Sequence, residues 1–369
     1  MVEASRRPAW AEIDVSALTA NLELLSALVA PARVCAVVKA DAYGHGAPRC
    51  AKALVESGTP VLAVGCVDEG IELREAGIEA PVLVLSEATG DALSEALASR
   101  LTPTVSSAEG MAALEHVRDD LRGFGAHLKV DTGMHRLGFN PKEAPEALER
   151  LETSLSAKLE GVWTHLAVAD GEEKEAVEFT ARQLSILASV VASVDAGVVR
   201  HAANSAGAIA CPVSRLDMVR LGIALYGELP APWLARSLGA QTAGGRLRPV
   251  LSLKARVVAV RELEAGDRPS YGRLRPLLQR SLVATVPLGY ADGVPRRLFE
   301  AGGEVLIGGR RRSLAGAVTM DQIVVDCGPL HDVACGDEVV LIGRQGREVI
   351  SAAAWAALLG TIPYEVLTG

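Results

Sequence analysis

The segment Cys35-Ala36-Val37-Val38-Lys39-Ala40-Asp41-Ala42-Tyr43-Gly44-His45-Gly46 joins a predicted strand to a reactive residue. The four apolar residues before Lys39 are typical of a parallel strand that is buried on both faces. The lysine stands where that strand should end, and a glycine-rich turn follows it. An apolar setting lowers the pKa of a lysine, so its free amine can attack a carbonyl group. The alternative interpretation is a surface lysine that only closes a strand.

This first strand is one of eight. Short β-rich runs alternate with longer helical stretches between residues 33 and 222. Eight such repeats predict an α/β fold, a (β/α)8 barrel of the TIM type. An open, doubly wound sheet is the alternative, and the missing GxGxxG motif after the first strand disfavours it. We expect strands at residues 34–38, 61–64, 82–85, 102–105, 126–130, 159–163, 198–201 and 218–221, and helices at residues 47–57, 68–76, 108–119 and 172–194.

The sequence pattern changes near residue 235, where Gly, Pro and Arg become frequent and the helical periodicity disappears. Turn signals such as Gly302-Gly303 separate short β runs, so we expect a mainly β domain. We place the barrel at residues 10–235 and the C-terminal β domain at residues 236–369, with a hinge within residues 227–249. The expected strands are residues 251–260, 281–287, 304–307, 322–325 and 338–342, before a last helix at residues 351–359.

The composition argues against several classes of function. The 369 residues are 49% hydrophobic and 22% charged, which is ordinary for a globular protein and enough for two domains. A net charge of −8 and only 4% aromatic residues disfavour nucleic acids and anionic membranes as partners. No apolar stretch approaches the ~20 residues of a membrane span, and the polar N-terminus predicts no signal peptide. The six cysteines contain no CxxC pair, so we expect no zinc site and a reducing cytoplasm.

The loops after the last two predicted strands suit a phosphate group. In eight-stranded barrels the active residues lie at the C-terminal ends of the strands, and a phosphate often binds after strands seven and eight. Residues 201–207 and 220–223 occupy those two positions here, and they are rich in small and hydroxyl side chains. Backbone N–H groups and a serine oxygen can hold a phosphate there. Two ordinary Gly/Ser loops are the alternative.

Four further charged or titratable residues lie at or near predicted strand ends. Arg220 must be paired if it is buried, and its partner is either a cofactor's pyridine nitrogen or a structural carboxylate. Arg136 suits a carboxylate or a phenolate oxygen. Lys129 lies inside a predicted barrel strand, so it must be paired, neutral or modified. His165 is either a satisfied core histidine or part of a proton relay.

Three of the five tyrosines lie in turn-like segments of the β domain. They are Tyr271 in Ser270-Tyr271-Gly272-Arg273, Tyr290 beside Gly289, and Tyr364 after Pro363. A tyrosine in an exposed turn usually serves packing. It becomes an acid or a base only where a positive neighbour lowers its pKa from ~10 towards neutral pH.

These segments, in their order and spacing, resemble the alanine racemases of bacteria from about Ala9 to the C-terminus. The resemblance implies a barrel plus a C-terminal β domain that also takes residues 1–9. It implies a cytoplasmic isomerase with pyridoxal 5'-phosphate and no metal, which interconverts L- and D-alanine by a two-base mechanism on an aldimine of that cofactor. It further implies a homodimer, and D-alanine for peptidoglycan precursors. A racemase of another small amino acid such as serine, a fold-related decarboxylase and a non-catalytic carrier of vitamin B6 are the alternatives.

The resemblance also assigns roles to single residues. Lys39 would bind the cofactor, and Lys39 and Tyr271 would be the two catalytic bases, with Tyr271 and Met320 supplied by the partner subunit. Lys129 would be carbamylated and would position Arg136. Arg136 and Met320 would bind the substrate, and Asp321 and Tyr290 would support the site. The residues around the cofactor would be Tyr43, His165, Asn204, Ser205, Arg220, Gly222, Ile223 and Tyr364.

The chain departs from the family pattern at three positions. Ala317 stands where the family usually has an arginine, which lines the substrate corridor with residues that match Asp170, His201 and Arg296. Val168 and Pro363 also differ from the usual residues. Lys39 and Tyr271 match the family, so we expect the chemistry to persist, while substrate entry and inhibitor sensitivity change.

Overall fold

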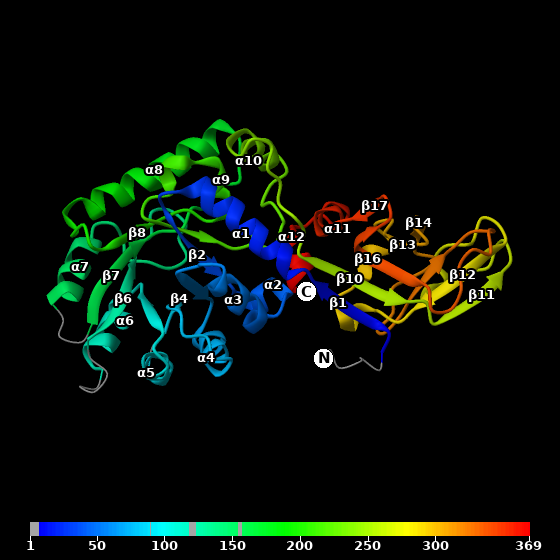
Figure 1. The fold of residues 1–369 in the computed structure, drawn as a ribbon, viewed down its shortest axis with the longest axis horizontal. Helices are drawn as coiled ribbons and strands as arrows, with labels where there is room; N and C mark the ends of the chain where they lie inside the picture. Colours follow the sequence, from blue (N-terminus) through cyan, green and yellow to red (C-terminus); the bar gives the residue numbers. More distant parts are fainter. Residues whose placement is uncertain (1–6, 89, 118–122, 154–156) are drawn as a thin grey trace. The chain divides into compact units, whose positions relative to one another are not determined.

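The computed structural model describes residues 7–88, 90–117, 123–153 and 157–369. The chain divides into two compact units (Figure 1). One unit is Val15–Arg248, and the other is Pro249–Gly369 together with the N-terminal residues up to Asp14. Residues 1–6, which the resemblance assigned to the second unit, lie outside the described part of the chain.

The first unit is a closed barrel of parallel strands, which confirms the predicted fold class (Figure 1). All eight expected strands are present, and β2 pairs with β9 to close the barrel, with Cys35 opposite Arg220. The strand that leads to Lys39 therefore runs beside the strand that carries Arg220. The strands are β2 Arg33–Val37, β3 Val61–Val64, β4 Val82–Glu87, β5 Thr102–Val105, β6 Phe124–Lys129, β7 Ala157–Trp163, β8 Val199–His201 and β9 Met218–Leu221.

Helices surround the barrel. They include the expected helical stretches, although the one predicted at residues 108–119 already ends at Glu115, and residues 118–119 lie outside the described part of the chain. They also include a helix inside the predicted hinge. That helix, α10, buries Leu234 and Leu238. The helices are α1 Val15–Val29, α2 Lys39–Gly44, α3 Ala47–Glu56, α4 Val67–Glu75, α5 Gly90–Ala98, α6 Ala108–Glu115, α7 Ala144–Thr153, α8 Lys174–Val190, α9 Ser205–Ala210 and α10 Leu234–Gln241.

The barrel interior is apolar apart from a few buried polar side chains. Val34, Cys35 and Ala36 of β2 are at most 4% exposed, as expected for a strand that is covered on both faces. His127, Lys129, His201 and Arg220 are also less than 9% exposed, and they lie on β6, β8 and β9. Buried charges and imidazoles need partners, so these side chains must be hydrogen-bonded to one another or to the backbone inside the barrel.

The second unit consists of two antiparallel sheets and two helices, which confirms a mainly β domain. One sheet has the order β1-β10-β16-β13-β14, with β17 paired to β16, and the other has the order β11-β12-β15. The elements are β1 Ala9–Ile13, β10 Leu251–Arg256, β11 Ala259–Leu263, β12 Ser281–Val286, β13 Glu304–Ile307, β14 Arg310–Ser313, β15 Ile323–Asp326, β16 Glu338–Gln345, β17 Glu348–Ile350, α11 Ala352–Leu359 and α12 Pro363–Thr368.

One expectation for this unit is wrong in detail, and the sequence analysis also missed strands. The single strand expected at residues 251–260 is two strands in different sheets, because Val257 N donates to Asp337 O while Val258 N donates to Thr285 O. Strand β14 was not expected, because its three arginines hide the alternation of apolar and polar residues that is typical of a strand. Its inward residue, Arg312, is buried and donates two hydrogen bonds to the carboxylate of Asp332 (2.9 and 2.8 Å). In the described part of the chain, no helix is long and apolar enough to cross a membrane.

A buried amide joins two distant parts of the barrel unit, and its removal should be costly. Asn21 on α1 donates to the carbonyls of Leu225 and Arg248 (2.9 and 2.8 Å) and accepts from Arg248 N (2.8 Å). We expect Asn21→Leu to lower the free energy of unfolding by about 2–4 kcal/mol, because it leaves buried backbone groups without partners. Urea unfolding followed by circular dichroism measures this loss. The exposed Glu23→Gln on the same helix is the control, and equal stability of both variants would refute the prediction.

Candidate active site

Lys39 begins a turn with an unusual hand. The four residues Ala40, Asp41, Ala42 and Tyr43 all have φ between 50° and 56° and ψ between 42° and 55°. These are left-handed helical values, which cost about 1–2 kcal/mol for each residue that has a Cβ atom. The sequence predicted a glycine-rich turn, but the left-handed backbone already begins at Ala40, before Gly44. Strain of this kind is often concentrated at functional sites.

Several contacts hold this turn in place. Asp41 accepts a hydrogen bond from Ala47 N at Oδ1 (2.6 Å), which joins the turn to the start of α3. The fully buried Tyr226 donates its hydroxyl to Val37 O (3.0 Å), at the end of the strand before Lys39. Its ring centroid lies 5.0 Å from that of Tyr43. A buried tyrosine usually has a hydrogen-bond partner, and the partner of Tyr226 is the backbone just before Lys39. Tyr226 was not among the predicted site residues.

Five predicted residues lie together at the ends of β8 and β9. Ser205 Oγ accepts hydrogen bonds from Gly222 N (3.0 Å) and Ala224 N (3.4 Å). Asn204 precedes α9, and its Oδ1 accepts from Gly207 N (2.9 Å). A Cβ atom on Gly222 would lie 2.2 Å from the hydroxyl of Tyr43, so only glycine fits there. Tyr43, Asn204, Ser205, Gly222 and Ile223 thus form one cradle of hydroxyl and backbone N–H groups, which suits a phosphate.

Arg220 is buried with neutral partners. Its side chain is 3% exposed, and among the described residues it has hydrogen bonds to no carboxylate. Desolvation lowers its pKa to about 10, so the guanidinium keeps its charge at neutral pH. The carbon of the guanidinium lies 4.5 Å from the ring centroid of Trp163, within the range of a cation–π contact. Its acceptors are His201 Nδ1 (2.8 Å), Thr164 O (2.8 Å), Ala202 O (3.0 Å) and His165 Nδ1 (3.1 Å).

This geometry fixes the protonation of three histidines. A guanidinium only donates, so Nδ1 of His165 and Nδ1 of His201 must accept, and each neutral ring carries its proton on Nε2. Nε2 of His201 then donates to Nδ1 of His127 (2.9 Å), and His127 in turn has its proton on Nε2. Desolvation first, and the charge of Arg220 second, lower the pKa of all three, to about 3 for His127. His201, which the resemblance places along a substrate corridor, is fully buried in this chain.

Four cations act on His165. The charges of Arg220, Arg136, Lys129 and Lys39 all lower its pKa, after desolvation. Desolvation and then Arg136 lower the pKa of Lys39, while desolvation, Arg136 and Arg220 lower that of Lys129 to about 8. Lys129 also lies 4.5 Å from the ring centroid of Trp163, which the sequence analysis missed. This end of the barrel is strongly positive and fits a ligand with more than one anionic group.

The predicted residues of the second unit gather around two linked turns. Tyr271 is 76% exposed and lies between Ser270, with φ 68°, and Gly272. Ser270 Oγ donates to Ala317 O (2.6 Å), which joins the tyrosine's turn to the segment that leads to Met320. Met320 is 54% exposed. The structure therefore presents Tyr271 and Met320 to solvent on segments that contact each other.

Tyr290 and Asp321 belong to the same group of turns. Tyr290 N donates to Thr319 O (3.0 Å), and Arg7 donates to the carboxylate of Asp292 (2.6 and 2.8 Å) and to Asp321 O (2.8 Å). Tyr364 is the second residue of α12 in this unit.

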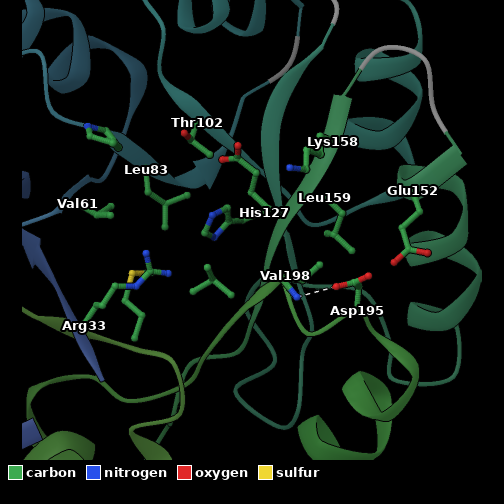
Figure 2. Close-up of a pocket in the computed structure, with 15 residues that line it drawn as sticks. Arg33, Val61, Leu83, Thr102, His127, Glu152, Lys158, Leu159, Asp195 and Val198 are labelled. Carbon is green, nitrogen blue, oxygen red and sulfur yellow. Dashed lines mark hydrogen bonds between the residues drawn. The ribbon is translucent and has the colours of Figure 1, made fainter. Parts of the chain in front are cut away.

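A cavity of about 750 Å³ lies at the other end of the barrel, where the strands begin (Figure 2). Figure 2 shows His127 among its lining residues, with Arg33 of β2 on one side and Lys158 of β7 on the other. None of the predicted site residues lines it. Barrel enzymes place their chemistry at the C-terminal ends of the strands, so we assign the active site to the Lys39 end and not to this cavity. In the described residues, no group of His, Cys, Asp and Glu is arranged to bind a metal ion.

Comparisons with known proteins agree over both units. Residues 13–230 match the family described as alanine racemase, N-terminal domain, and residues 250–369 match alanine racemase, C-terminal domain. The chain is 42% identical to the alanine racemase of Carboxydothermus hydrogenoformans, over 98% of this chain and 97% of that protein. It is 43% identical to that of Symbiobacterium thermophilum, over 98% and 95%. The solved alanine racemase of Bacillus anthracis with bound L-Ala-P is 35% identical, with a TM-score of 0.90 over 99% and 93% of the two chains.

The neutral histidines predict how stability depends on pH. The folded pKa of His127 is about 3 against 6.5 for the free side chain, so below about pH 6.5 the unfolded chain binds a proton that the folded chain does not. We therefore expect the free energy of unfolding to fall as the pH is lowered from about 7 to about 5, by about 1.4 kcal/mol per pH unit for each such histidine. Urea titrations at several pH values measure the slope.

The variants His127→Phe and His116→Gln separate the buried histidine from an exposed one. We expect His127→Phe to reduce the slope by roughly one proton, and His116→Gln, exposed just beyond the end of α6, is the control for removal of a histidine. Identical slopes for wild type and His127→Phe would show that His127 is not held neutral.

Proposed function

Because this chain belongs to the alanine racemase family, it is an isomerase that acts on alanine, and we propose that pyridoxal 5'-phosphate bound at Lys39 is its cofactor. The observation that carries this proposal is a group of four cations, Lys39, Arg136, Lys129 and Arg220, whose charges all lower the pKa of His165 at the end of β7, where Arg220 also donates to the ring (3.1 Å). A phosphorylated cofactor and a substrate carboxylate would together bring further anions to these cations. When bound, pyridoxal phosphate withdraws electrons from the substrate's Cα–H bond and makes that proton removable.

The cradle at the ends of β8 and β9 fits the phosphate. Ser205 Oγ and the backbone N–H groups of Gly222 and Ile223 would bind its oxygens, with the hydroxyl of Tyr43 beside them. Tyr43 lies in the left-handed turn after Lys39. Its hydroxyl is so close to Gly222 that a side chain on this glycine would collide with it. Tyr364 of the second unit would complete the set.

Arg220 would bind the pyridine nitrogen of the cofactor. Its pKa of about 10 means that the guanidinium remains charged and does not give up a proton at neutral pH. The nitrogen would therefore accept a hydrogen bond without being protonated, which makes the cofactor a weaker electron sink. By holding the nitrogen unprotonated, Arg220 would favour return of the proton to Cα over side reactions such as transamination.

Lys39 and Tyr271 would act as the two bases on opposite faces of the substrate. The lowered pKa of Lys39 provides the free amine that removes a proton from D-alanine. Tyr271 would act on L-alanine, and Nε2–H of His165 would donate to its phenolate oxygen. Arg136 and Met320 would hold the substrate carboxylate, with Tyr290 and Asp321 behind them.

We also propose that Tyr271 and Met320 reach the site from a partner subunit. Leu274 and Leu278 follow Tyr271 and are 51% and 93% exposed, so several large apolar side chains are exposed on one segment. Exposed apolar side chains that are clustered in this way support a protein interface. The six cysteines are free thiols, which supports a reducing, cytoplasmic location. We propose that the D-alanine made there supplies peptidoglycan precursors.

The two-base proposal predicts the behaviour of two variants. We expect Lys39→Ala to abolish the absorbance of the bound cofactor, because no amine remains to hold it. We expect Tyr271→Phe to retain that absorbance and to lose roughly 10²–10⁴-fold in the conversion of L- to D-alanine, the range for a lost acid–base group. A coupled assay of D-alanine formation measures the loss. A Tyr271→Phe variant with full turnover would remove Tyr271 from the mechanism.

A mixed dimer tests the origin of Tyr271. Chains that carry Lys39→Ala and chains that carry Tyr271→Phe can be given different tags, expressed together and purified through both tags. If the tyrosine crosses between subunits, each mixed dimer has one intact site and should show about half of the wild-type activity. If Tyr271 serves its own chain, both sites are damaged and the mixed dimer is inactive. The two homodimers of the single variants are the controls.

Lys129 is expected to carry a carbamate. Its pKa of about 8 leaves part of the amine uncharged at neutral pH, and only the uncharged amine reacts with CO2. The carbamate would replace the charge of Lys129 by an anion beside the other three cations and would position Arg136. Enzyme equilibrated with ¹³C-labelled bicarbonate should show a carbamate carbon signal in NMR spectra, and Lys129→Gln should lack it. The same signal in both proteins would place the carbamate elsewhere, and no signal in the wild type would exclude it.

A further inference from the structure

We propose that Glu69 is the positioning residue for Lys39: its carboxylate holds the left-handed turn that carries the lysine and places a negative charge beside it. The proposal rests on the proposed function of Lys39, because it assigns a role to the group that keeps this lysine in position. Glu69 lies on α4, which follows β3, whereas Lys39 follows β2. The residue therefore acts across two neighbouring strand ends of the barrel.

Both oxygens of Glu69 accept short hydrogen bonds from backbone N–H groups. Oε1 accepts from Ala40 N (2.7 Å), and Oε2 accepts from Gly65 N (2.6 Å). Hydrogen bonds of this kind, from an amide to an ionised carboxylate, are shorter and stronger than neutral ones. The carboxylate thus joins the residue after Lys39 to the residue after β3.

Helix capping accounts for only one of these two bonds. Glu69 is the third residue of α4, and a glutamate at that position often reaches back to the backbone just before its helix. The bond to Gly65 N is of this type. The bond to Ala40 N is not, because Ala40 belongs to the turn after a different strand. This second bond is the one that points to a role at Lys39.

The second bond also meets a need of the turn. Ala40 is the first of four consecutive residues with left-handed values, and such a turn persists only where its surroundings hold it. Within the turn, Ala42 N donates to Val38 O and His45 N donates to Asp41 O (both 2.9 Å). The N–H of Ala40 is held by the side chain of Glu69 instead. Loss of that carboxylate would free the N-terminal end of the turn, directly beside Lys39.

Glu69 is also the carboxylate whose charge acts on Lys39. The other charged or titratable groups around the lysine come from different elements: Arg136 and Lys129 from β6 and the loop after it, and His165, held neutral, from the end of β7. Desolvation and Arg136 lower the pKa of Lys39, and Glu69 raises it. Removal of the Glu69 charge should therefore lower the pKa of Lys39 further, and a purely structural residue would not have that effect.

Three variants test the proposal in the full chain. Glu69→Gln keeps the size and removes the charge, and Glu75→Gln, exposed on the same helix, is the matched control for charge. Gly65→Ala keeps the charge but displaces the carboxylate, because a Cβ atom at residue 65 would lie 3.2 Å from Oε2 of Glu69. This third variant perturbs the same contact from the opposite side, so the test does not depend on Glu69→Gln alone.

Two measurements report on the two parts of the proposal. Hydrogen exchange of the Ala40 amide reports on the anchor, and we expect it to be roughly tenfold faster in Glu69→Gln, the change for one lost charge-assisted bond. The rate at which the chain, freed of cofactor, binds added pyridoxal phosphate through Lys39 reports on the lysine. Because only the free amine reacts, the pH midpoint of that rate should move to lower pH in Glu69→Gln, and less so in Gly65→Ala.

The outcomes separate this proposal from the function on which it depends. A lower midpoint and faster exchange in Glu69→Gln, with Glu75→Gln like the wild type, would support it. A midpoint equal to that of Glu75→Gln would overturn it, even if the variant is less stable, because the residue would then serve only the fold. A wild-type chain that never gains the cofactor's absorbance would overturn the proposed function of Lys39 itself.

Discussion

Arg220 is a permanent positive charge in the interior of a barrel, and among the described residues it has hydrogen bonds only to neutral acceptors. This single constraint organises the surrounding site. Because a guanidinium can only donate, it dictates which nitrogen of His165 and of His201 is protonated, and through His201 that of His127. The same charge, after desolvation, holds all three rings neutral. Neutral partners leave the charge of Arg220 available to a ligand.

The part of the site around Lys39 depends on a strained turn, which contacts with other residues hold in place. The left-handed turn places Tyr43 against Gly222, so a distortion after β2 shapes the cradle after β9. Tyr226 fixes the strand before the turn, and Glu69 bonds to its first residue. The positive charges around His165 and the strained turn belong to one unit, and the exposed Tyr271 belongs to the other. The proposed chemistry needs both units, and the apolar side chains exposed after Tyr271 are the reason to propose that the tyrosine comes from a partner subunit.

The parts of the structure that the sequence predicted are those that local patterns encode. The eight barrel strands were predicted in order, because a strand covered on both faces is a short apolar run between helices. Patterns that depend on distant partners were missed. Residues 251–260 read as one strand, although their hydrogen bonds go to two different sheets. Strand β14 is hidden by its arginines, since the burial of Arg312 requires Asp332, twenty residues later in the chain.

The sequence by itself determined the alternation of strands and helices, the change to a β domain, and the motifs around Lys39, Arg220 and Tyr271, because each is a property of neighbouring residues. Only the tertiary structure decided three features. The turn after Lys39 is left-handed, hydrogen bonds run from Arg220 through His201 to His127, and the carboxylate of Glu69 accepts from Ala40 N. The physical reason is that a left-handed backbone, a tautomer and a shared carboxylate are each set by groups brought together from separate strands when the barrel closes.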